Sequence, residues 1–338
     1  MILNDIQLIP YNVELDKPLL NSKNNFYKKK GYYIKIKSHD CYGYGEVCVL
    51  ENFSTEIIAD INNIFLEFYN CCVFDKEVSF IDLLALVEYE CHKSPSLIFG
   101  LNTALYDIQA KKKNISIAEY INKNNAQVIS LSSIYNHQAI KNFQFIKIKM
   151  LESDIKVELT RINTILKNFN KNIIVRLDAN QLYEIEDILW LDKNIDHSFI
   201  QYIEEPICSP TIDNYIYLNR KTEFKYAIDE SLYIGNDWIF VDEDIIDYLV
   251  VKPSILGSYK TFFDIITKAK KQRIDIVLSS ALETFIGNMA IVNLASAISN
   301  NMHHGISIHL FYDSYKIYDN YEKIYFKNII GLGTQLND

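Results

Sequence analysis

The stretch NIIVRLDAN, residues 172–180, has the form that decides the fold of this chain. It is a short apolar run that ends in an aspartate, Asp178, and a helix-length segment follows it. Runs that are apolar on both faces are typical of parallel strands covered by helices. Similar runs recur from about residue 127 to 310: VISLSS (128–133), FIKIKM (145–150), FIQYIEEP (199–206), KYAIDES (225–231), YLVVKPS (248–254), DIVLSS (275–280) and HGISI (304–308).

Eight such strands alternating with helices predict a (β/α) barrel, here of the modified TIM type (β/α)7β. A doubly wound open sheet would give a similar pattern. However, no glycine-rich phosphate loop follows any of the runs, which weakens a dinucleotide-binding interpretation.

The chain before about residue 120 has a different order. Strand-like runs at 2–13, 31–38 and 41–50 come first, and helical patterns near 54–70, 79–92 and 97–113 follow. That order predicts a small α+β unit. We therefore expect two domains, residues 1–120 and 121–310, and we expect the tail of about 311–338 to pack back on the first.

The composition of the 338 residues, 49% hydrophobic and 23% charged, is that of an ordinary globular protein. The net charge of −9 argues against a nucleic-acid-binding surface. No apolar run is long enough to span a membrane, no signal peptide is evident, and the six cysteines form no C-x-x-C pair. We expect a reduced, cytoplasmic monomer or small homo-oligomer. The lysines of the KKK runs at 28–30 and 111–113 are expected to be solvated.

One polar residue ends each successive strand of the predicted barrel. These residues are Lys149, Asp178, Glu204, Asp229, Lys252 and Ser279, and they recur at intervals of about one β–α unit. In a barrel these ends converge on one mouth, where barrel active sites are built. Each residue alone is more often a turn former or a helix cap. Several in register on consecutive strands are hard to explain in that way.

Three neighbouring carboxylates, those of Asp178, Glu204 and Asp229, suit Mg²⁺, with Mn²⁺ as a possible substitute. Lys149 and Lys252 flank them from opposite sides. Lys147 shares the inward face of its strand with Lys149, because side chains alternate along a strand. A lysine close to a cation and to another ammonium group is pushed toward its neutral form, as a general base requires. This spacing therefore predicts a small-molecule active site.

The motifs KIK, LDAN, EEP, DES and VKP, in this order, resemble the enolase superfamily and its muconate-lactonizing branch. Within that branch the chain is most similar to the o-succinylbenzoate synthases of menaquinone biosynthesis. The stretches GYGEVCVLENFS, SPSLIFGLNTAL and LSSALETFIG extend the resemblance over about residues 43 to 290. The resemblance implies a (β/α)7β barrel with an N-terminal α+β capping domain.

The resemblance also implies roles for the strand-end residues. The three carboxylates would bind Mg²⁺, with Glu230 behind them. Lys149 would remove the proton α to the substrate carboxylate, the metal would stabilise the enediolate, and the proton would return to the departing hydroxide. Lys252 would stabilise the intermediate by its charge. This lyase reaction would convert 2-succinyl-6-hydroxy-2,4-cyclohexadiene-1-carboxylate to o-succinylbenzoate.

Substrate contacts are expected from three further residues. Arg176 shares the inward face of Asp178 and is a candidate carboxylate partner, although it could instead neutralise the acidic cluster. Ser279 and the backbone of Gly305 match family positions near the succinyl carboxylate, and Glu283 would organise the mouth. Segments around 14–31 and 46–54 would close on the substrate. LSSIYN and the tail after Gly305 depart from the family pattern.

Other functions use the same residues. An N-succinylamino-acid racemase or a dipeptide epimerase would employ the two lysines as bases on opposite faces of the substrate. The epimerases usually carry an Asp-x-Asp pair after strand eight, which HGISIHL lacks. A muconate cycloisomerase is a further alternative within the branch. A non-catalytic ligand-binding barrel is the alternative from another class.

Overall fold

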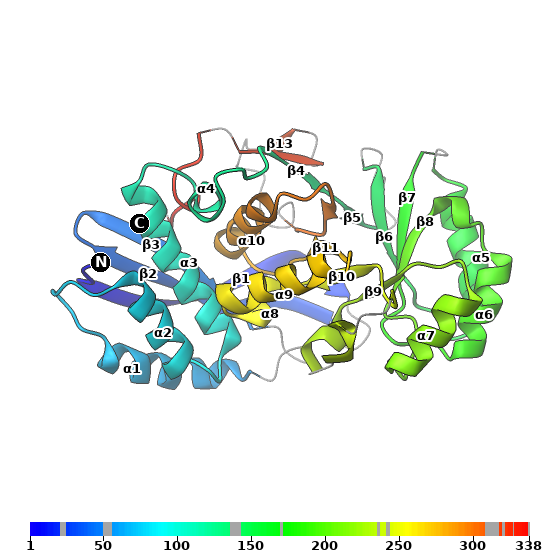
Figure 1. Cartoon of the computed structure of the whole chain (residues 1–338), viewed down its shortest axis with the longest axis horizontal. Helices are drawn as coiled ribbons and strands as arrows, with labels where there is room; N and C mark the ends of the chain where they lie inside the picture. The colour runs from blue at the N-terminus through cyan, green and yellow to red at the C-terminus, as the bar shows by residue number, and fades with distance from the viewer. Residues whose placement is uncertain are drawn as a thin grey trace.

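The computed structural model shows an N-terminal unit on one side and a barrel on the other (Figure 1). It describes residues 1–20, 25–49, 56–135, 143–169, 172–234, 237–240, 244–307, 318–319, 322–326 and 328–336.

The N-terminal unit has strands first and helices second, as the sequence predicts. Three antiparallel strands form its sheet in the order β1 (Asp5–Leu20), β2 (Asn25–Ser38) and β3 (Cys41–Val47). The helices are α1 (Ile61–Cys71), α2 (Phe80–Glu90) and α3 (Pro95–Lys112), with a 3-10 turn, η1 (Ile58–Asp60), before them. Helix α3 packs directly on β3, and two glycines of β3 allow this close approach. A Cβ at Gly43 would overlap the backbone oxygen of Ala104, and a Cβ at Gly45 would overlap that of Gly100.

The second unit is a closed parallel barrel. Its strands are β4 (Val128–Leu131) continuing into β5 (Ser133–Ile134), then β6 (Phe145–Lys149), β7 (Ile174–Asp178), β8 (Ile200–Glu204), β9 (Tyr226–Ile228), β10 (Tyr248–Val251), β11 (Asp275–Leu278) and β12 (His303–His304). Neighbours from β5 to β11 pair in parallel. Strand β12 pairs with β4, and a bridge between Ser279 and Gly305 joins it to the end of β11. The predicted barrel fold is therefore confirmed.

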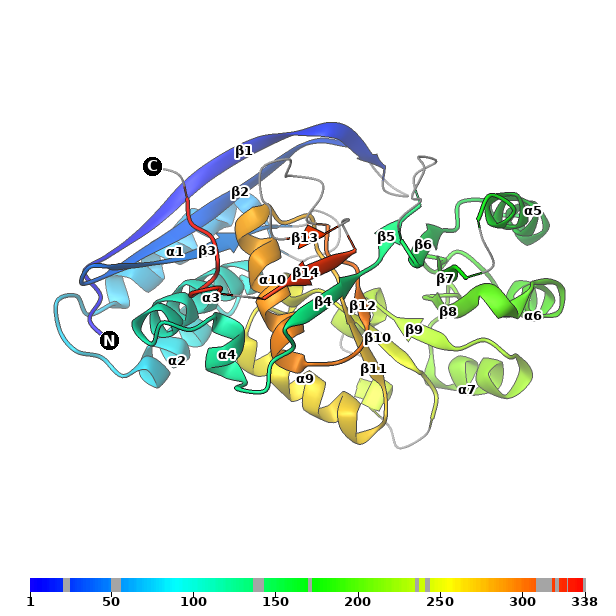
Figure 2. The ribbon, with the colours of Figure 1, turned by 90° about the horizontal axis from the view of Figure 1, so that it is seen from above.

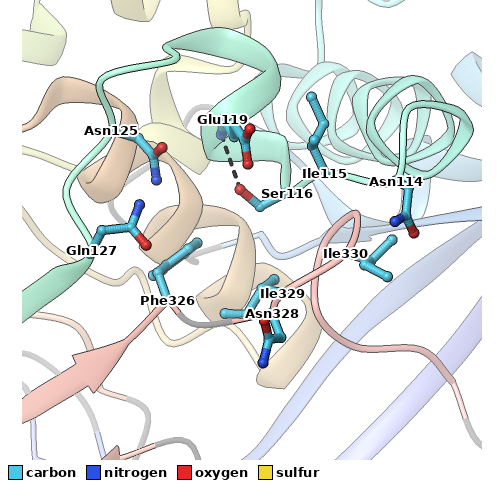
Figure 3. Close-up of a pocket in the computed structure, with 10 residues that line it drawn as sticks. All are labelled: Asn114, Ile115, Ser116, Glu119, Asn125, Gln127, Phe326, Asn328, Ile329 and Ile330. Atoms are coloured by element: carbon cyan, nitrogen blue, oxygen red, sulfur yellow. Dashed lines mark hydrogen bonds between the residues drawn. The ribbon is translucent and has the colours of Figure 1, made fainter.

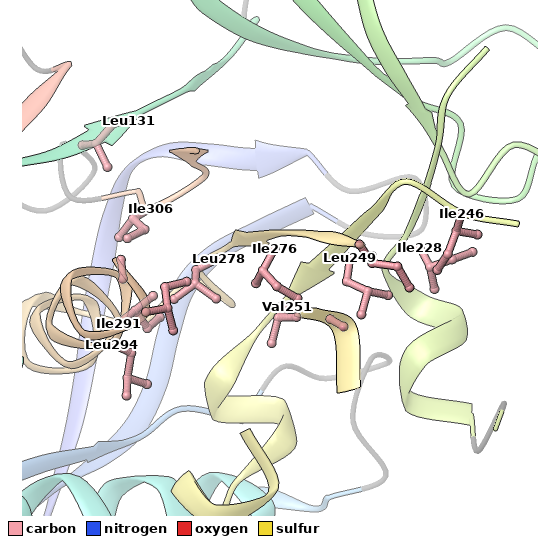
Figure 4. Close-up of a cluster of buried hydrophobic side chains, with 14 of the residues drawn as sticks. Leu131, Ile228, Ile246, Leu249, Val251, Ile276, Leu278, Ile291, Leu294 and Ile306 are labelled. Atoms are coloured by element: carbon pink, nitrogen blue, oxygen red, sulfur yellow. The ribbon is translucent and has the colours of Figure 1, made fainter. Parts of the chain in front are cut away.

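Most helices of the second unit cover the outside of the barrel, and two short ones pack against α3 instead. The helices are α4 (Ile117–Ile121), α5 (Ile155–Leu166), α6 (Ile185–Asn194), α7 (Ile212–Lys221), α8 (Pro253–Leu256), α9 (Tyr259–Lys271) and α10 (Phe285–Ile298), with 3-10 turns η2 (His197–Phe199), η3 (Glu230–Ile234) and η4 (Asp237–Phe240). Figure 4 shows outward-facing strand residues such as Leu249 and Leu278 in one apolar cluster with Ile291 of α10. The strands are apolar on both faces because the inner face packs as well, through Tyr202, Val250 and their neighbours.

The C-terminal segment extends the sheet at β4. Strand β14 (Lys323–Tyr325) pairs antiparallel with β4, and β13 (Tyr318–Asp319) pairs with β14 (Figure 2). Farther on, the Leu332 N–H donates to Asp107 Oδ1 of α3 at 2.7 Å. The end of the tail thus contacts the N-terminal unit. The domain boundaries themselves stay a prediction.

The expectation that the KKK runs are solvated was wrong for two lysines. Lys29 is only 7% exposed, and its Nζ donates to the Val49 backbone oxygen at 2.8 Å. Its neighbours Lys28 and Lys30 are exposed, because alternation along β2 turns every second side chain inward. Lys111 pairs with the buried Asp107 at 2.7 Å.

Candidate active site

The predicted strand-end residues come together at one end of the barrel. Register pairing places Lys149 opposite Asp178, and Asp178 opposite Glu204, on three adjacent strands. Asp229 directly follows β9, and Lys252 directly follows β10. The three carboxylates are buried, each 3% exposed or less. The local cause is the alternation of side chains, which sends every second residue of each strand into the barrel.

Two lysines bind these carboxylates. Lys147 Nζ lies 2.7 Å from Asp178 Oδ2 and 2.8 Å from Glu204 Oε1. Lys252 Nζ donates to both carboxylate oxygens of Asp229. Lys149, which is half-buried beside Asp178, forms no ion pair with the residues that the structure describes. Lys147 and Lys252 are therefore ion-paired with the carboxylates, whereas Lys149 is not.

Burial and charge compete for the ionisation of this cluster. Burial lowers the pKa of Lys147, but Asp178 and Glu204 raise it more, so that it lies well above its ordinary value. Burial raises the pKa of Glu204 well above its usual range, and Asp178 and Asp229 add to that shift despite Lys147. Burial also raises the pKa of Glu230 to about 8, with Asp229 adding to it. The negative charge is thus only partly balanced, which favours a bound cation.

The donor set fits a hard divalent cation. Three carboxylates stand at the ends of consecutive strands, and carboxylate oxygens are the ligands that Mg²⁺ prefers. Glu204 Oε2 and Glu230 Oε2 are buried, and neither has a hydrogen-bond partner among the described residues. Among the described residues, no three acidic, histidine or cysteine side chains are arranged so that they could hold a metal ion. Lys147 and Lys252 bind oxygen atoms of these carboxylates, so a cation bound here would have to displace their ammonium groups.

Two residues that the sequence did not single out hold the carboxylates in place. Glu205 Oε1 accepts hydrogen bonds from the backbone N–H groups of Asp229, at 2.9 Å, and Ser231, at 2.8 Å. Asn180 Nδ2 donates to Asp178 Oδ1 at 2.8 Å. In the sequence, these residues are the second glutamate of EEP and the asparagine of LDAN. Both motifs have the pattern of an ordinary strand end, so neither residue was distinguishable from a turn former.

Arg176 lies deeper in the barrel than the carboxylates. It is 1% exposed, its Nε donates to Gln201 Oε1 at 2.7 Å, and its Nη1 donates to the His303 backbone oxygen at 2.6 Å. Its guanidinium also lies over the rings of Phe145 and Tyr202. None of these contacts is with a carboxylate, and the buried Nη2 has no hydrogen-bond partner among the described residues. Both roles of Arg176, substrate binding and charge balance, therefore stay predictions.

Ser279 and Gly305 meet where the barrel closes. Gly305 N–H donates to the Leu278 oxygen at 2.8 Å, and a Cβ at Gly305 would lie 3.4 Å from Ser279 Oγ. Nearby, Glu283 is fully buried and accepts hydrogen bonds from Ser254 Oγ and the Ala281 N–H. Burial raises the pKa of Glu283 to about 7. Of the segments predicted to close on the substrate, residues 21–24 and 50–54 lie outside the described residues.

A separate pocket of about 380 Å³ lies between the α3–α4 connection and the C-terminal segment (Figure 3). Asn114, Glu119, Gln127 and Asn328 give it a largely polar lining, and it contains none of the candidate residues. It therefore carries no argument about the chemistry at the strand ends. Within the part of the chain that the structure describes, no helix combines the length and apolar character needed to cross a membrane.

Comparisons with known proteins agree with the fold described above. The chain is 26% identical over 309 residues to the o-succinylbenzoate synthase of Bacillus subtilis, covering 86% of this chain and 81% of that protein. Its fold is similar to that of a dipeptide epimerase from Enterococcus faecalis complexed with Mg and the dipeptide L-Leu-L-Tyr, with a TM-score of 0.87, 16% identity, and coverage of 98% and 99%. It is also similar to the N-succinyl Arg/Lys racemase from Bacillus cereus, with a TM-score of 0.86, 17% identity, and coverage of 100% and 96%.

Because the sequence identity to the two solved structures is low, these similarities support the fold alone, which is the barrel with its capping unit. The family model described as enolase C-terminal domain-like matches residues 135–337, which is more than half of the chain. On that match, the chain belongs to the enolase C-terminal domain-like family of the enolase superfamily.

Proposed function

We propose that the chain is a Mg²⁺-dependent o-succinylbenzoate synthase, a lyase that dehydrates 2-succinyl-6-hydroxy-2,4-cyclohexadiene-1-carboxylate in menaquinone biosynthesis. The observation that carries the proposal is the line of Lys149, Asp178 and Glu204 in register across three adjacent strands. Such a line would put a base directly beside a hard-cation site. The similarity to the Bacillus subtilis synthase supports this substrate over others.

In the proposed reaction Lys149 is the base and the acid. The C–H bond α to the ring carboxylate breaks, and its proton goes to Lys149 Nζ. The electron pair then moves into the ring as the C–O bond to the hydroxyl group breaks, and the departing hydroxide takes the proton from Lys149 to leave as water. Lys149 suits this role because no carboxylate among the described residues binds its ammonium group, whereas Lys147 and Lys252 are ion-paired.

The remaining residues hold charge. Asp178, Glu204 and Asp229 would bind Mg²⁺ or Mn²⁺, which supplies positive charge at the substrate carboxylate. Lys252, on the other side of the site, would stabilise the anion without exchanging protons. Burial opposes ionisation of the Asp178 and Glu204 carboxyl groups, and the Lys147 ammonium group would act against it by lowering the pKa of both. The six cysteines, all free, fit the reduced cytoplasmic setting that we propose for the reaction.

The test is to follow the ultraviolet absorbance of the diene substrate with purified protein, with Mg²⁺ and with a chelator. Turnover should require the metal and should fall by about 10²–10⁴-fold in Lys149→Ala, the usual contribution of a general base. Lys167→Ala, an exposed lysine at the end of α5, is the matched control. A folded, metal-bound protein without turnover would rule the synthase out.

The second candidate is an N-succinylamino-acid racemase or dipeptide epimerase, the activities named for two solved structures that share the fold. In that case both Lys149 and Lys252 would exchange the α-proton of the substrate with solvent. Incubation of N-succinylamino acids and dipeptides in deuterated water distinguishes the candidates. A non-catalytic barrel would keep its ligand affinity in Lys252→Ala and would show no turnover with any of these compounds.

A further inference from the structure

The two lysines on opposite sides of the site share a feature of their backbones. Each stands where a strand ends: Lys149 is the last residue of β6, and Lys252 follows β10 and precedes the short helix α8. At such ends a peptide group loses its partner in the sheet and needs another. In both cases one side chain provides it. Arg161 Nη2 donates to the Lys149 backbone oxygen at 2.6 Å, and the Lys252 N–H donates to Tyr233 Oη at 2.6 Å.

Arg161 forms an ion pair with Glu158, which lies one turn earlier on α5. Its Nε donates to Glu158 Oε2 at 3.0 Å, and Glu158 is fully buried. Glu158 Oε2 also accepts hydrogen bonds from the backbone N–H groups of Leu151, at 3.3 Å, and Glu152, at 3.1 Å. This ion pair therefore fixes the main chain both at Lys149 and just beyond it.

Tyr233 reaches Lys252 from η3, the turn that follows Asp229. Its ring packs against a small apolar cluster formed by Ile255 and Ala281, with Leu282 beside them. The Lys252 carbonyl accepts a hydrogen bond from the Ile255 N–H at 3.0 Å, so that both peptide groups of this lysine are engaged. Tyr233 thus ties the end of β10 to the loop that follows β9.

We propose that Arg161 and Tyr233 are positioning residues, one for each lysine, and that they set where the two ammonium groups lie relative to the reacting carbon. The proposal rests on the function proposed above. A lysine side chain is long and flexible, so its reach depends on where its backbone is held. Asp229 also holds the Lys252 ammonium group, whereas no ion pair in the described part of the chain holds Lys149. Arg161 therefore carries more of the alignment than Tyr233.

Two conservative variants test this. Arg161→Lys keeps a positive charge for Glu158 but cannot donate to Glu158 and to the Lys149 oxygen in the way a planar guanidinium does. Tyr233→Phe removes only the hydroxyl group. Arg161→Lys should lower kcat by about 10- to 100-fold with KM unchanged, because a displacement of about 1 Å can cost that much. Tyr233→Phe should lower kcat by less. The controls are Arg220→Lys and Tyr217→Phe, both exposed on α7.

A readout that does not depend on turnover is the chemical labelling of each lysine. The full chain is treated with a small acylating reagent, and labelling of Lys149 and Lys252 is measured by peptide mass spectrometry. Arg161→Lys should change labelling at Lys149 and leave Lys252 as in the wild type, and Tyr233→Phe should do the reverse. A variant that merely loosened the fold would change both sites together.

Unchanged kcat in both folded variants, or a joint change of labelling at both lysines in each variant, would overturn the proposal. If the wild type turns over neither the diene nor the N-succinylamino acids and dipeptides, the proposed function fails, and the labelling pattern still decides whether the two side chains position the lysines. Thermal unfolding of each variant establishes that it is folded. Tyr233→Phe keeps the test available should Arg161→Lys not fold.

Discussion

The two sides of the barrel mouth are built in different ways. On the side of β6 to β10, charged side chains meet: Lys147 binds Asp178 and Glu204, and Lys252 binds Asp229. On the side where β11, β12 and β4 close the barrel, the contacts come mainly from backbone groups. Gly305 N–H donates to the Leu278 oxygen, and the Ser280 N–H donates to the Gly305 oxygen at 3.1 Å.

The second side is fixed by the N-terminal unit instead of by ion pairs within the barrel. Glu46 of β3 is fully buried against the start of α10. Its carboxylate accepts hydrogen bonds from Tyr11 Oη at 2.6 Å, from Thr284 N at 2.8 Å and Oγ1 at 2.7 Å, and from the Gly287 N–H at 2.8 Å. A helix N-terminus favours such a negative charge. One side of the mouth is therefore arranged for charge chemistry, and the other depends on how the two units meet.

The largest expected effect is on the charged side. Asp178→Asn should lower the affinity for Mg²⁺ by more than about a thousandfold, because even residues that only support a metal ligand cost 10- to 100-fold. Titration calorimetry with Mg²⁺ alone measures this. Asp213→Asn, on the exposed start of α7, should bind as the wild type does. Equal affinities in the two variants would remove Asp178 from the metal site.

The next effect concerns what Lys147 does in the protein without metal. Lys147→Met leaves Asp178 and Glu204 buried with less compensating charge, so the free energy of unfolding in a chelator should fall by about 3 kcal/mol. Added Mg²⁺ should recover most of this loss, because the cation replaces the missing charge. Urea unfolding with and without Mg²⁺ gives both quantities. A loss that Mg²⁺ does not reduce would mean that the metal and Lys147 do not share these carboxylates.

The comparison of the two sides also shows what the sequence can predict. Charged residues that end short apolar runs at regular spacing are visible locally, and the structure brings Lys149, Asp178 and Glu204 together as expected. Glu205 escaped notice because its partners, the Asp229 and Ser231 backbone groups, lie one strand away in space. The burial of Lys29 was not predicted, because it depends on which face of β2 lies toward the backbone of Val49 in the folded chain.

The closing side was hard to predict for a different reason. Strand β12 spans only His303–His304, and its pairing with β4 uses backbone groups that every residue possesses. The pairing of β14 with β4 joins segments almost two hundred residues apart, and the local sequence of neither strand predicts this pairing. Arg176 shows a limit of sequence-based prediction on the charged side. Alternation along β7 predicts that its side chain points into the barrel, but it does not predict how deeply the side chain is buried.

The third prediction tests the closing side. Glu46→Ala should leave the N–H groups of Thr284 and Gly287 unsatisfied in a buried place, which should reduce the free energy of unfolding by about 2 kcal/mol. Urea unfolding measures the loss. Glu119→Ala, an exposed glutamate of α4, should change it by far less. If both variants unfold alike, Glu46 does not hold the two units together.

The smallest effect is a dependence of stability on pH that arises at Glu283. Burial raises the pKa of this carboxyl group from 4.5 to about 7, so the folded protein binds its proton more tightly than the unfolded chain does. The contribution of Glu283 to stability is therefore fully present below pH 4.5 and is lost as the pH rises through about 7. Glu283→Gln should mimic the protonated form, because an amide can still accept from the Ala281 N–H and donate to Ser254.

Wild type and Glu283→Gln should accordingly be nearly equal in stability at pH 5. The variant should exceed the wild type by on the order of 1–2 kcal/mol at pH 8. Taking the difference between the two proteins at each pH cancels the titration of the other carboxylates, which both proteins share. A difference that stays constant from pH 5 to 8 would show that Glu283 is ionised throughout that range. In that case the closing side of the mouth would carry a second buried carboxylate beside Glu46, and the contrast between the two sides would have to be given up.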